Sequence, residues 1–258
     1  MTAKEIIDLS VEDRRSKIIA QVKGYESIED ELEKAILISD VINTFIEEYI
    51  ALQVERDDAL GEKSILKNSS SLKAAIDAQF TKFLPIAIEA LREEYQKLKS
   101  TDPKNVYELS GAYKLAFASN ATRTLSTTMG LFLESVASIS PYAINPESEF
   151  GIKVKGIDLI AKNCNTDLIE YQQMKTQRNT LTGSQKERVV KELSLHENPV
   201  VCASFPLNSW TFKHGDIARV AGADFWSRIG MPYDTVQEEV GKLIRKIEGE
   251  YIKILEDE

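Results

Sequence analysis

The order of secondary-structure elements predicted between residues 151 and 205 constrains the fold more than any other feature of this sequence. Strand-like apolar segments are separated by a polar turn and by a helix; the strands are Gly151–Ile160, Leu168–Lys175 and Pro199–Phe205, the turn is Asn163–Asp167 and the helix is Ser184–His196. A tight turn joins antiparallel strands, whereas a strand–helix–strand unit forms a right-handed crossover between parallel strands. The sequence therefore predicts a small mixed sheet, to which Trp210–His214 would add a short fourth strand.

Most of the remaining chain is predicted to be helical. The 258 residues include only 12 Gly and 7 Pro, which disfavours an all-β fold. The spacing of apolar residues and the capping residues predict helices that begin near Ser10, Ser27, Leu72, Val106, Thr122, Ala223 and Asp234. The helix that begins near Ser27 is expected to run to Ile50, and Pro85 is expected to kink or divide the next one.

These patterns together predict an α/β fold, in which a small mixed β-sheet is flanked by helices. We expect a large helical region over residues 1–119 and an α/β core with a C-terminal helix over residues 120–258. Because strands and helices interleave along the chain, we do not expect two independent domains.

The charge of the chain is unevenly distributed. Asp and Glu outnumber Lys and Arg by 41 to 32, and the net charge of −9 argues against indiscriminate binding to nucleic acid. The balance reverses over one stretch, with basic residues at Lys153, Lys155, Lys162, Lys175, Arg178, Lys186, Arg188 and Lys191. The sequence is therefore compatible with a local basic cleft.

The ends and the cysteines of the chain bear on its location. Cys164 and Cys202 lack the spacing of a metal site and are expected to be free thiols. The segment Met1–Glu5 has no apolar signal core, and no apolar run is long enough to cross a bilayer. We expect a soluble, cytoplasmic protein with no membrane partner.

The strand and hairpin pattern places a group of chemically suited side chains together. Gln173 and Lys175 are two residues apart on a strand and share a face, while the carbonyl of Met174 can face a metal. Asp158, on the antiparallel neighbour, reaches the same position if the hairpin register allows it. A carboxylate that binds Mg²⁺ and a lysine that polarises a water or a phosphate are the groups that phosphodiester hydrolysis requires.

Glu134 is a further candidate for the same site. It is the only acidic residue between Thr122 and Ala143, on a helix face that is otherwise small and apolar. A single carboxylate on such a helix is costly to pack unless a cation or a donor meets it. We therefore expect Glu134 to face the site.

The order of these residues resembles the PD-(D/E)xK nuclease superfamily and, within it, the type II restriction endonucleases. The resemblance covers roughly residues 120–255, with Gly130 and Glu134 on a helix, Asp158 on a strand, Gln173-x-Lys175 on the next strand and a helix from Ser184. The later stretch Ala221–Trp226 is similar to a Gly-x-x-Phe-Trp segment near the end of some restriction enzymes. Ile157 stands where the family has proline, and Gln173 stands where it has an acid. An alternative register would use Glu170 and Gln172 instead.

The resemblance implies a restriction-endonuclease-like core and a Mg²⁺-dependent enzyme that cleaves double-stranded DNA at a specific short sequence, as a homodimer. Asp158 and Glu134 would bind the metal, Gln173 would position the metal or a water, and Lys175 would polarise the nucleophile. The residues expected to contact DNA are Arg178, Asn179, Thr180, Thr182 and Lys186. The helices of residues 1–119 would form the dimer interface or arms around the duplex. The alternatives are a non-catalytic helical interaction protein and a structure-specific repair nuclease.

Overall fold

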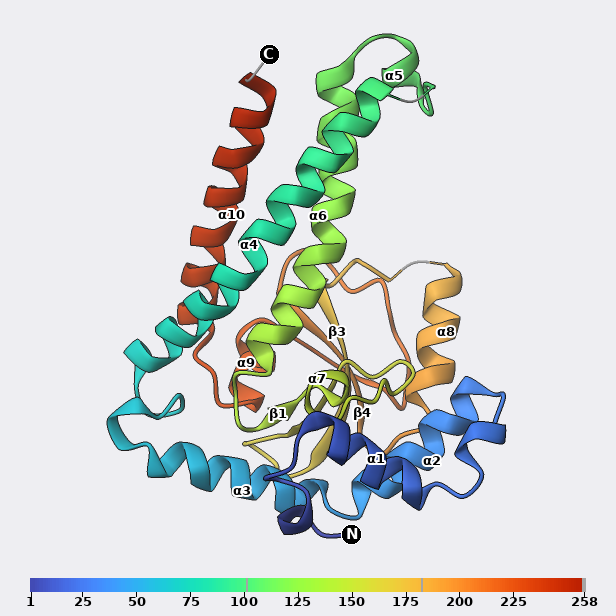
Figure 1. Cartoon of the computed structure of the whole chain (residues 1–258), viewed down its shortest axis with the longest axis vertical. Coiled ribbons are helices and arrows are strands. Elements are labelled where there is room, and N and C mark those ends of the chain that lie inside the picture. Colours follow the sequence, from blue (N-terminus) through green and yellow to red (C-terminus); the bar gives the residue numbers. More distant parts are fainter. Residues whose placement is uncertain (101, 182, 257–258) are drawn as a thin grey trace.

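The computed structural model describes residues 1–100, 102–181 and 183–256 and has a mixed α/β fold. The described residues form ten α-helices and one five-stranded sheet (Figure 1). The strands are β1 (Ala143–Ile144), β2 (Leu159–Lys162), β3 (Ile169–Gln177), β4 (Pro199–Phe205) and β5 (Ala218–Ala221). The prediction of a small mixed sheet among helices is thus confirmed.

The sheet follows the chain order, β1-β2-β3-β4-β5. β1 pairs with β2 and β2 with β3 in antiparallel orientation, whereas β3 with β4 and β4 with β5 are parallel. The hairpin and the crossover predicted from the sequence are therefore present, and α8 (Ser184–Leu193) forms the crossover between β3 and β4.

Two strand predictions were wrong. The predicted strand Gly151–Ile160 is a loop as far as Asp158, because Gly151 and Gly156 adopt left-handed backbone angles (φ 65° and 80°) that interrupt an extended chain. Trp210–His214 is not a strand either. Its backbone is satisfied in part by side chains, since Arg219 donates from Nη1 to the Phe212 carbonyl at 2.8 Å. The strand that completes the sheet is β5, which lies further along the chain.

The helices surround the sheet and differ in detail from the prediction. In addition to α8, they are α1 (Val11–Gln21), α2 (Glu31–Asn43), α3 (Ile46–Ala59), α4 (Ser69–Ser100), α5 (Val106–Leu109), α6 (Tyr113–Ala137), α7 (Pro146–Phe150), α9 (Ala223–Arg228) and α10 (Tyr233–Glu256). The helix expected to run to Ile50 is divided at Thr44 and Phe45. The helix expected to begin near Thr122 instead begins at Tyr113, and Pro85 lies inside the continuous α4. α4 packs against both α6 and α10 and continues past the proline.

The two faces of the sheet belong to two separate apolar cores. On one face, Met174 and Cys202 pack with α4, α6, α9 and α10; on the other, Tyr171 and Val201 pack with α1, α2, α3 and α8. Side chains alternate between the faces along each strand, so β3 and β4 contribute to both cores. In Figure 1, α4, α6 and α10 extend together beyond the sheet, with α5 at their far end.

The helical region 1–119 is built into both cores. α1 to α3 cover one face of the sheet, while α4 packs on the other side with α6. The division between residues 119 and 120 falls inside α6. Within the described residues, no helix combines the length and the apolar character needed to span a membrane.

Candidate active site

Asp158 lies at the point where β2 and β3 stop pairing. The last pair of their ladder joins Leu159 to Gln172. Asp158 directly precedes β2, and its backbone N–H donates to the Gln172 carbonyl at 3.0 Å. Its Oδ2 atom accepts a hydrogen bond of 2.7 Å from the Met174 N–H. The carboxylate therefore satisfies the backbone donor that β2 no longer reaches, while β3 continues beyond it.

Gln173 and Lys175 follow on β3 and face away from the Met174 side chain. Met174 is buried in the core with α6, so alternation places Gln173 and Lys175 on the opposite face with Tyr171. Gln173 is only 5% exposed, and its Oε1 atom has no hydrogen-bond partner among the described residues. A buried amide oxygen without a donor is costly, which makes this atom a position where a cation or a water would be stabilising.

Glu134, on α6, lies close enough to Asp158 and Lys175 for their charges to act on one another. Burial of the half-buried Glu134 carboxyl, followed by the negative charge of Asp158, raises its pKa to about 7, and Lys175 opposes this rise. Burial also raises the pKa of Asp158, against the lowering effects of Lys175 and of the Met174 N–H. The charges of Glu134, Asp158 and Lys175 thus act on one another near the point where β2 begins.

Two charged residues that the sequence did not single out also lie near Asp158. The exposed Lys153, in the loop before β2, lowers the pKa of both Glu134 and Asp158. The buried Glu192, on α8, raises the pKa of Asp158. The basic stretch that begins at Lys153 could have indicated Lys153. The position of Glu192 next to Leu193, on the apolar face of α8, could have indicated Glu192.

Glu170 and Gln172, the residues of the alternative register, are buried and hydrogen-bonded within the chain. Glu170 accepts hydrogen bonds from Asn163 Nδ2 at 2.7 Å and from Gln172 Nε2 at 2.9 Å, and it pairs with Arg228. Glu170 and Gln172 are both buried. Because the Glu170 carboxylate is already neutralised and hydrogen-bonded, it has little capacity for a further cation. Glu170 is therefore already engaged within the chain, whereas the charge of Lys175 acts on the Asp158 carboxyl.

The residues expected to contact DNA follow β3 directly, and two of them are engaged within the chain. Arg178 donates from Nη1 to the Asn208 carbonyl at 3.5 Å. The Asn179 Oδ1 atom accepts from Gln177 Nε2 at 2.9 Å and from Asn208 Nδ2 at 3.3 Å. These contacts hold the segment after β3 against the loop after β4, so binding to a base would require their exchange.

The other three expected contacts differ in accessibility. Thr180 is exposed, and its hydroxyl donates to the Gln177 carbonyl at 3.1 Å. Lys186 is half-buried in the first turn of α8. Thr182 lies outside the described residues. Thr180 and Lys186 therefore remain on the surface that adjoins the end of β3.

The donors around Asp158 suit a hard cation. The candidates are the Asp158 carboxylate, the Glu134 carboxylate from α6 on the Met174 face and the Gln173 amide oxygen on the opposite face. The Met174 carbonyl faces the same strand edge as its N–H. In the part of the chain that the structure describes, no group of three or more His, Cys, Asp and Glu side chains is placed to hold a metal. An all-oxygen set with few protein ligands fits Mg²⁺, which keeps several waters.

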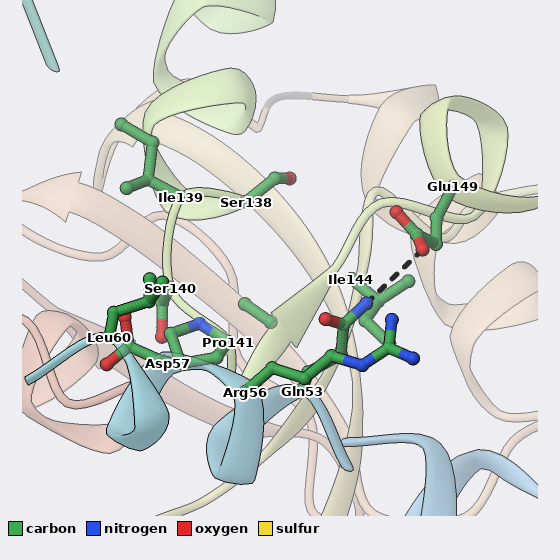
Figure 2. Close-up of a pocket in the computed structure, with 11 residues that line it drawn as sticks. Gln53, Arg56, Asp57, Leu60, Ser138, Ile139, Ser140, Pro141, Ile144 and Glu149 are labelled. Carbon is green, nitrogen blue, oxygen red and sulfur yellow. Dashed lines mark hydrogen bonds between the residues drawn. The ribbon is translucent and has the colours of Figure 1, made fainter. Parts of the chain in front are cut away.

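A separate pocket of about 310 Å³ has a different character (Figure 2). It is lined by Gln53, Arg56, Asp57, Leu60, Ser138, Ile139, Ser140, Pro141, Ala143, Ile144 and Glu149. Gln53 Nε2 donates to Glu149 at 3.5 Å, and Arg56 pairs with Asp8 at 2.6 Å. Asp57 accepts from the Ser64 hydroxyl at 2.6 Å. Its charged groups are thus already paired, and none of the residues around Asp158 lines it.

Comparison with protein-family models, with curated proteins and with solved structures found no match to this chain.

Proposed function

We propose that this chain is a Mg²⁺-dependent endonuclease that hydrolyses phosphodiester bonds of double-stranded DNA at a specific short sequence, in the manner of a type II restriction enzyme. The observation that carries the proposal is that the charges of Asp158, Lys175 and Glu134 act on one another where β2 begins, with the Asp158 carboxylate fixed by the Met174 N–H. A fixed carboxylate beside a lysine and a second carboxylate is suited to bind a cation and a phosphate together.

Each residue of the group has a chemical role in this proposal. Asp158 and Glu134 would hold the cation, and the unpartnered Oε1 of Gln173 would hold the cation or a water. When bound, Mg²⁺ supplies neutralisation of the negative charge that develops on the phosphate and acidifies the attacking water. Lys175 would donate to the scissile phosphate or orient that water. The exposed Lys153 would meet a neighbouring phosphate.

The arrangement of elements supports the same proposal at a larger scale. Residues 120–258 would be a nuclease-like core, since a carboxylate-bearing helix, a hairpin and a crossover helix surround the site in the order that the superfamily shows. Arg178, Asn179, Thr180 and Lys186 would contact the duplex beside this site. A homodimer would present two such sites to the two strands of a palindromic target.

The direct test compares the full chain with variants on unmethylated DNA in the presence of Mg²⁺. We expect discrete fragments from the wild type and a loss of about a hundredfold or more in rate for both Asp158→Asn and Lys175→Ala. Asn at 158 keeps an oxygen that can accept the Met174 N–H, so this variant removes charge without removing the contact. The exposed Asp216→Asn is the matched control.

Two outcomes would distinguish the proposed site and function from their alternatives. Discrete fragments that persist undiminished in both variants would exclude the proposed site. Cleavage of branched or flapped DNA without cleavage at a fixed sequence would identify a structure-specific repair nuclease on the same residues.

A second candidate function is a non-catalytic module that binds another protein through its helices. It is favoured by exposed apolar side chains on α5 and on the first turn of α6, which are Val106, Tyr107, Leu109, Tyr113 and Leu115. α5 lies at the far end of the helices that extend beyond the sheet (Figure 1). Calorimetry discriminates the two functions, because this module would give no heat with Mg²⁺, either with or without DNA.

A further inference from the structure

Glu192 is a buried acid that the proposed chemistry leaves unused. It lies near the end of α8, on the side that packs against the sheet, and it is 4% exposed. α8 covers the face of β3 to which Tyr171 and Gln173 belong. Buried Glu residues are rare unless a partner compensates the charge. The negative charge of the buried Glu192 carboxylate therefore requires a compensating group.

The carboxylate of Glu192 lies against the backbone of the loop that leads to Asp158. A Cβ atom on Gly156 would stand 2.4 Å from the Glu192 Cβ and 2.8 Å from its Oε2. Gly156 also has a φ of 80°, which favours glycine. The loop can thus approach Glu192 closely only because residue 156 has no side chain, and this contact is two residues from Asp158.

The protein itself supplies little positive charge to Glu192. Its ion pair among the described residues is with Arg188, at 3.7 Å from Nε to Oε1, and the Arg188 side chain is 65% exposed. A long contact with a solvent-exposed partner contributes little. The Glu192 carboxylate lies against Gly156, two residues before Asp158. Its negative charge is therefore close to the place where the cation is proposed to bind.

The negative charge of Glu192 compensates for the charge that the neutral Gln173 side chain lacks. The amide of Gln173 is neutral, so Asp158 and Glu134 would be the only anionic ligands of the cation. Asp158, Glu134 and Glu192 do not form a group that could hold an ion directly. Mg²⁺, however, keeps several of its waters in protein sites, and a carboxylate can act on it through them.

We propose that Glu192 supplies the additional negative charge of the cation site and acts, through water, on a divalent cation held by Asp158. This rests on the proposed function, since it requires that Asp158 bind the cation. Glu192 is a positioning residue here, because it does not itself touch the cation or the substrate.

The test is calorimetric titration of the full chain with MgCl₂ in the absence of DNA. We expect Glu192→Gln to weaken Mg²⁺ binding about tenfold or more, as loss of an outer-shell partner does. The matched control is Glu187→Gln, which lies on the exposed face of the same helix and should bind Mg²⁺ as the wild type does. Arg188→Gln should have the opposite effect and strengthen binding by about two- to fivefold, because it removes the cation that competes for Glu192.

The opposite signs of the two effects separate an electrostatic role from a structural one. Circular dichroism of each variant checks folding. If Glu192→Gln does not fold, Arg188→Gln decides, and unchanged or weaker Mg²⁺ binding by that variant would overturn the role of Glu192. Wild-type binding that Glu192→Gln leaves unchanged would overturn this role while the proposed nuclease function stands. No Mg²⁺ binding by the wild type, with or without DNA, would overturn both.

Discussion

At the scale of the residue, the surroundings of Glu134 disfavour the ionised form of its carboxyl group. Burial and the neighbouring Asp158 raise its pKa to about 7 from an ordinary value near 4.5. A carboxyl whose pKa is raised on folding favours the neutral form, so its stabilising contribution is complete below pH 4.5 and is lost as the pH rises through 7. The metal-free protein therefore has a penalty at alkaline pH that it lacks in acid.

We predict that Glu134→Gln stabilises the metal-free protein at pH 8 by about 1–3 kcal/mol and has little effect at pH 4.5. Urea unfolding at the two pH values measures the difference. Glu187→Gln, at an exposed position, should change neither value. A Glu134→Gln variant that is no more stable than the wild type at pH 8 would show that the carboxylate is not opposed by its environment.

At the scale of the element, the loop between Gly151 and Asp158 packs closely against α8 just before β2 begins. Gly156 combines a left-handed backbone with a close approach to Glu192, so any side chain there would both strain the loop and displace the helix. Gly130, by contrast, lies inside α6 with nothing within 4 Å of the position that a Cβ would take. A side chain can therefore be accommodated at residue 130 but not at residue 156.

We predict opposite effects for the same substitution at these glycines. Gly156→Ala should destabilise the protein by about 2–4 kcal/mol, since it adds backbone strain and a steric clash. Gly130→Ala should stabilise it by up to about 1 kcal/mol, because alanine restricts the unfolded chain and favours the helix. Thermal and urea unfolding measure both. Equal effects at the two positions would contradict the packing of the loop against α8.

The elements that could be predicted from the sequence are those with a local signal. β4 has the predicted bounds because its continuous apolar run needs no partner to be recognised. β2 is shorter than predicted because a left-handed glycine cannot be read from apolar spacing alone. β5 was missed because only four residues pair, and two of them are exposed.

The sequence proposes residues for the candidate site, but it does not specify the contacts that position them. The alternation of Gln173 and Lys175 follows from the strand itself. The contact of Asp158 with the Met174 N–H depends on where the β2 ladder ends, which is a property of the loop and of its packing. The approach of Glu192 joins a helix and a loop that are far apart in the sequence, and no local pattern encodes it.

At the scale of the whole molecule, one sheet lies between two cores, and Tyr142, just before β1, packs against both of them. Met174 belongs to the core with α4, α6 and α10, and Tyr171 belongs to the core with α1 to α3. Loss of either core would expose one face of the same strands to water, which removes much of the stabilisation of the other face. A chain of 258 residues exceeds the size at which two-state unfolding is usual. The shared sheet nevertheless favours a single transition.

The two tryptophans report separately on the two cores. Trp226 is buried with the first core, and its Nε1 donates to the Ser204 carbonyl at 2.9 Å, whereas Trp210 packs against the second core. Trp210→Phe leaves the first reporter and Trp226→Phe leaves the second. We predict that, in each variant, tryptophan fluorescence and far-UV circular dichroism give the same urea midpoint, because the sheet transmits the loss of one core to the other. Comparison within each variant removes the destabilisation that the substitution itself causes. A fluorescence midpoint that separates from the dichroism midpoint in either variant would mean that one core unfolds while the sheet persists.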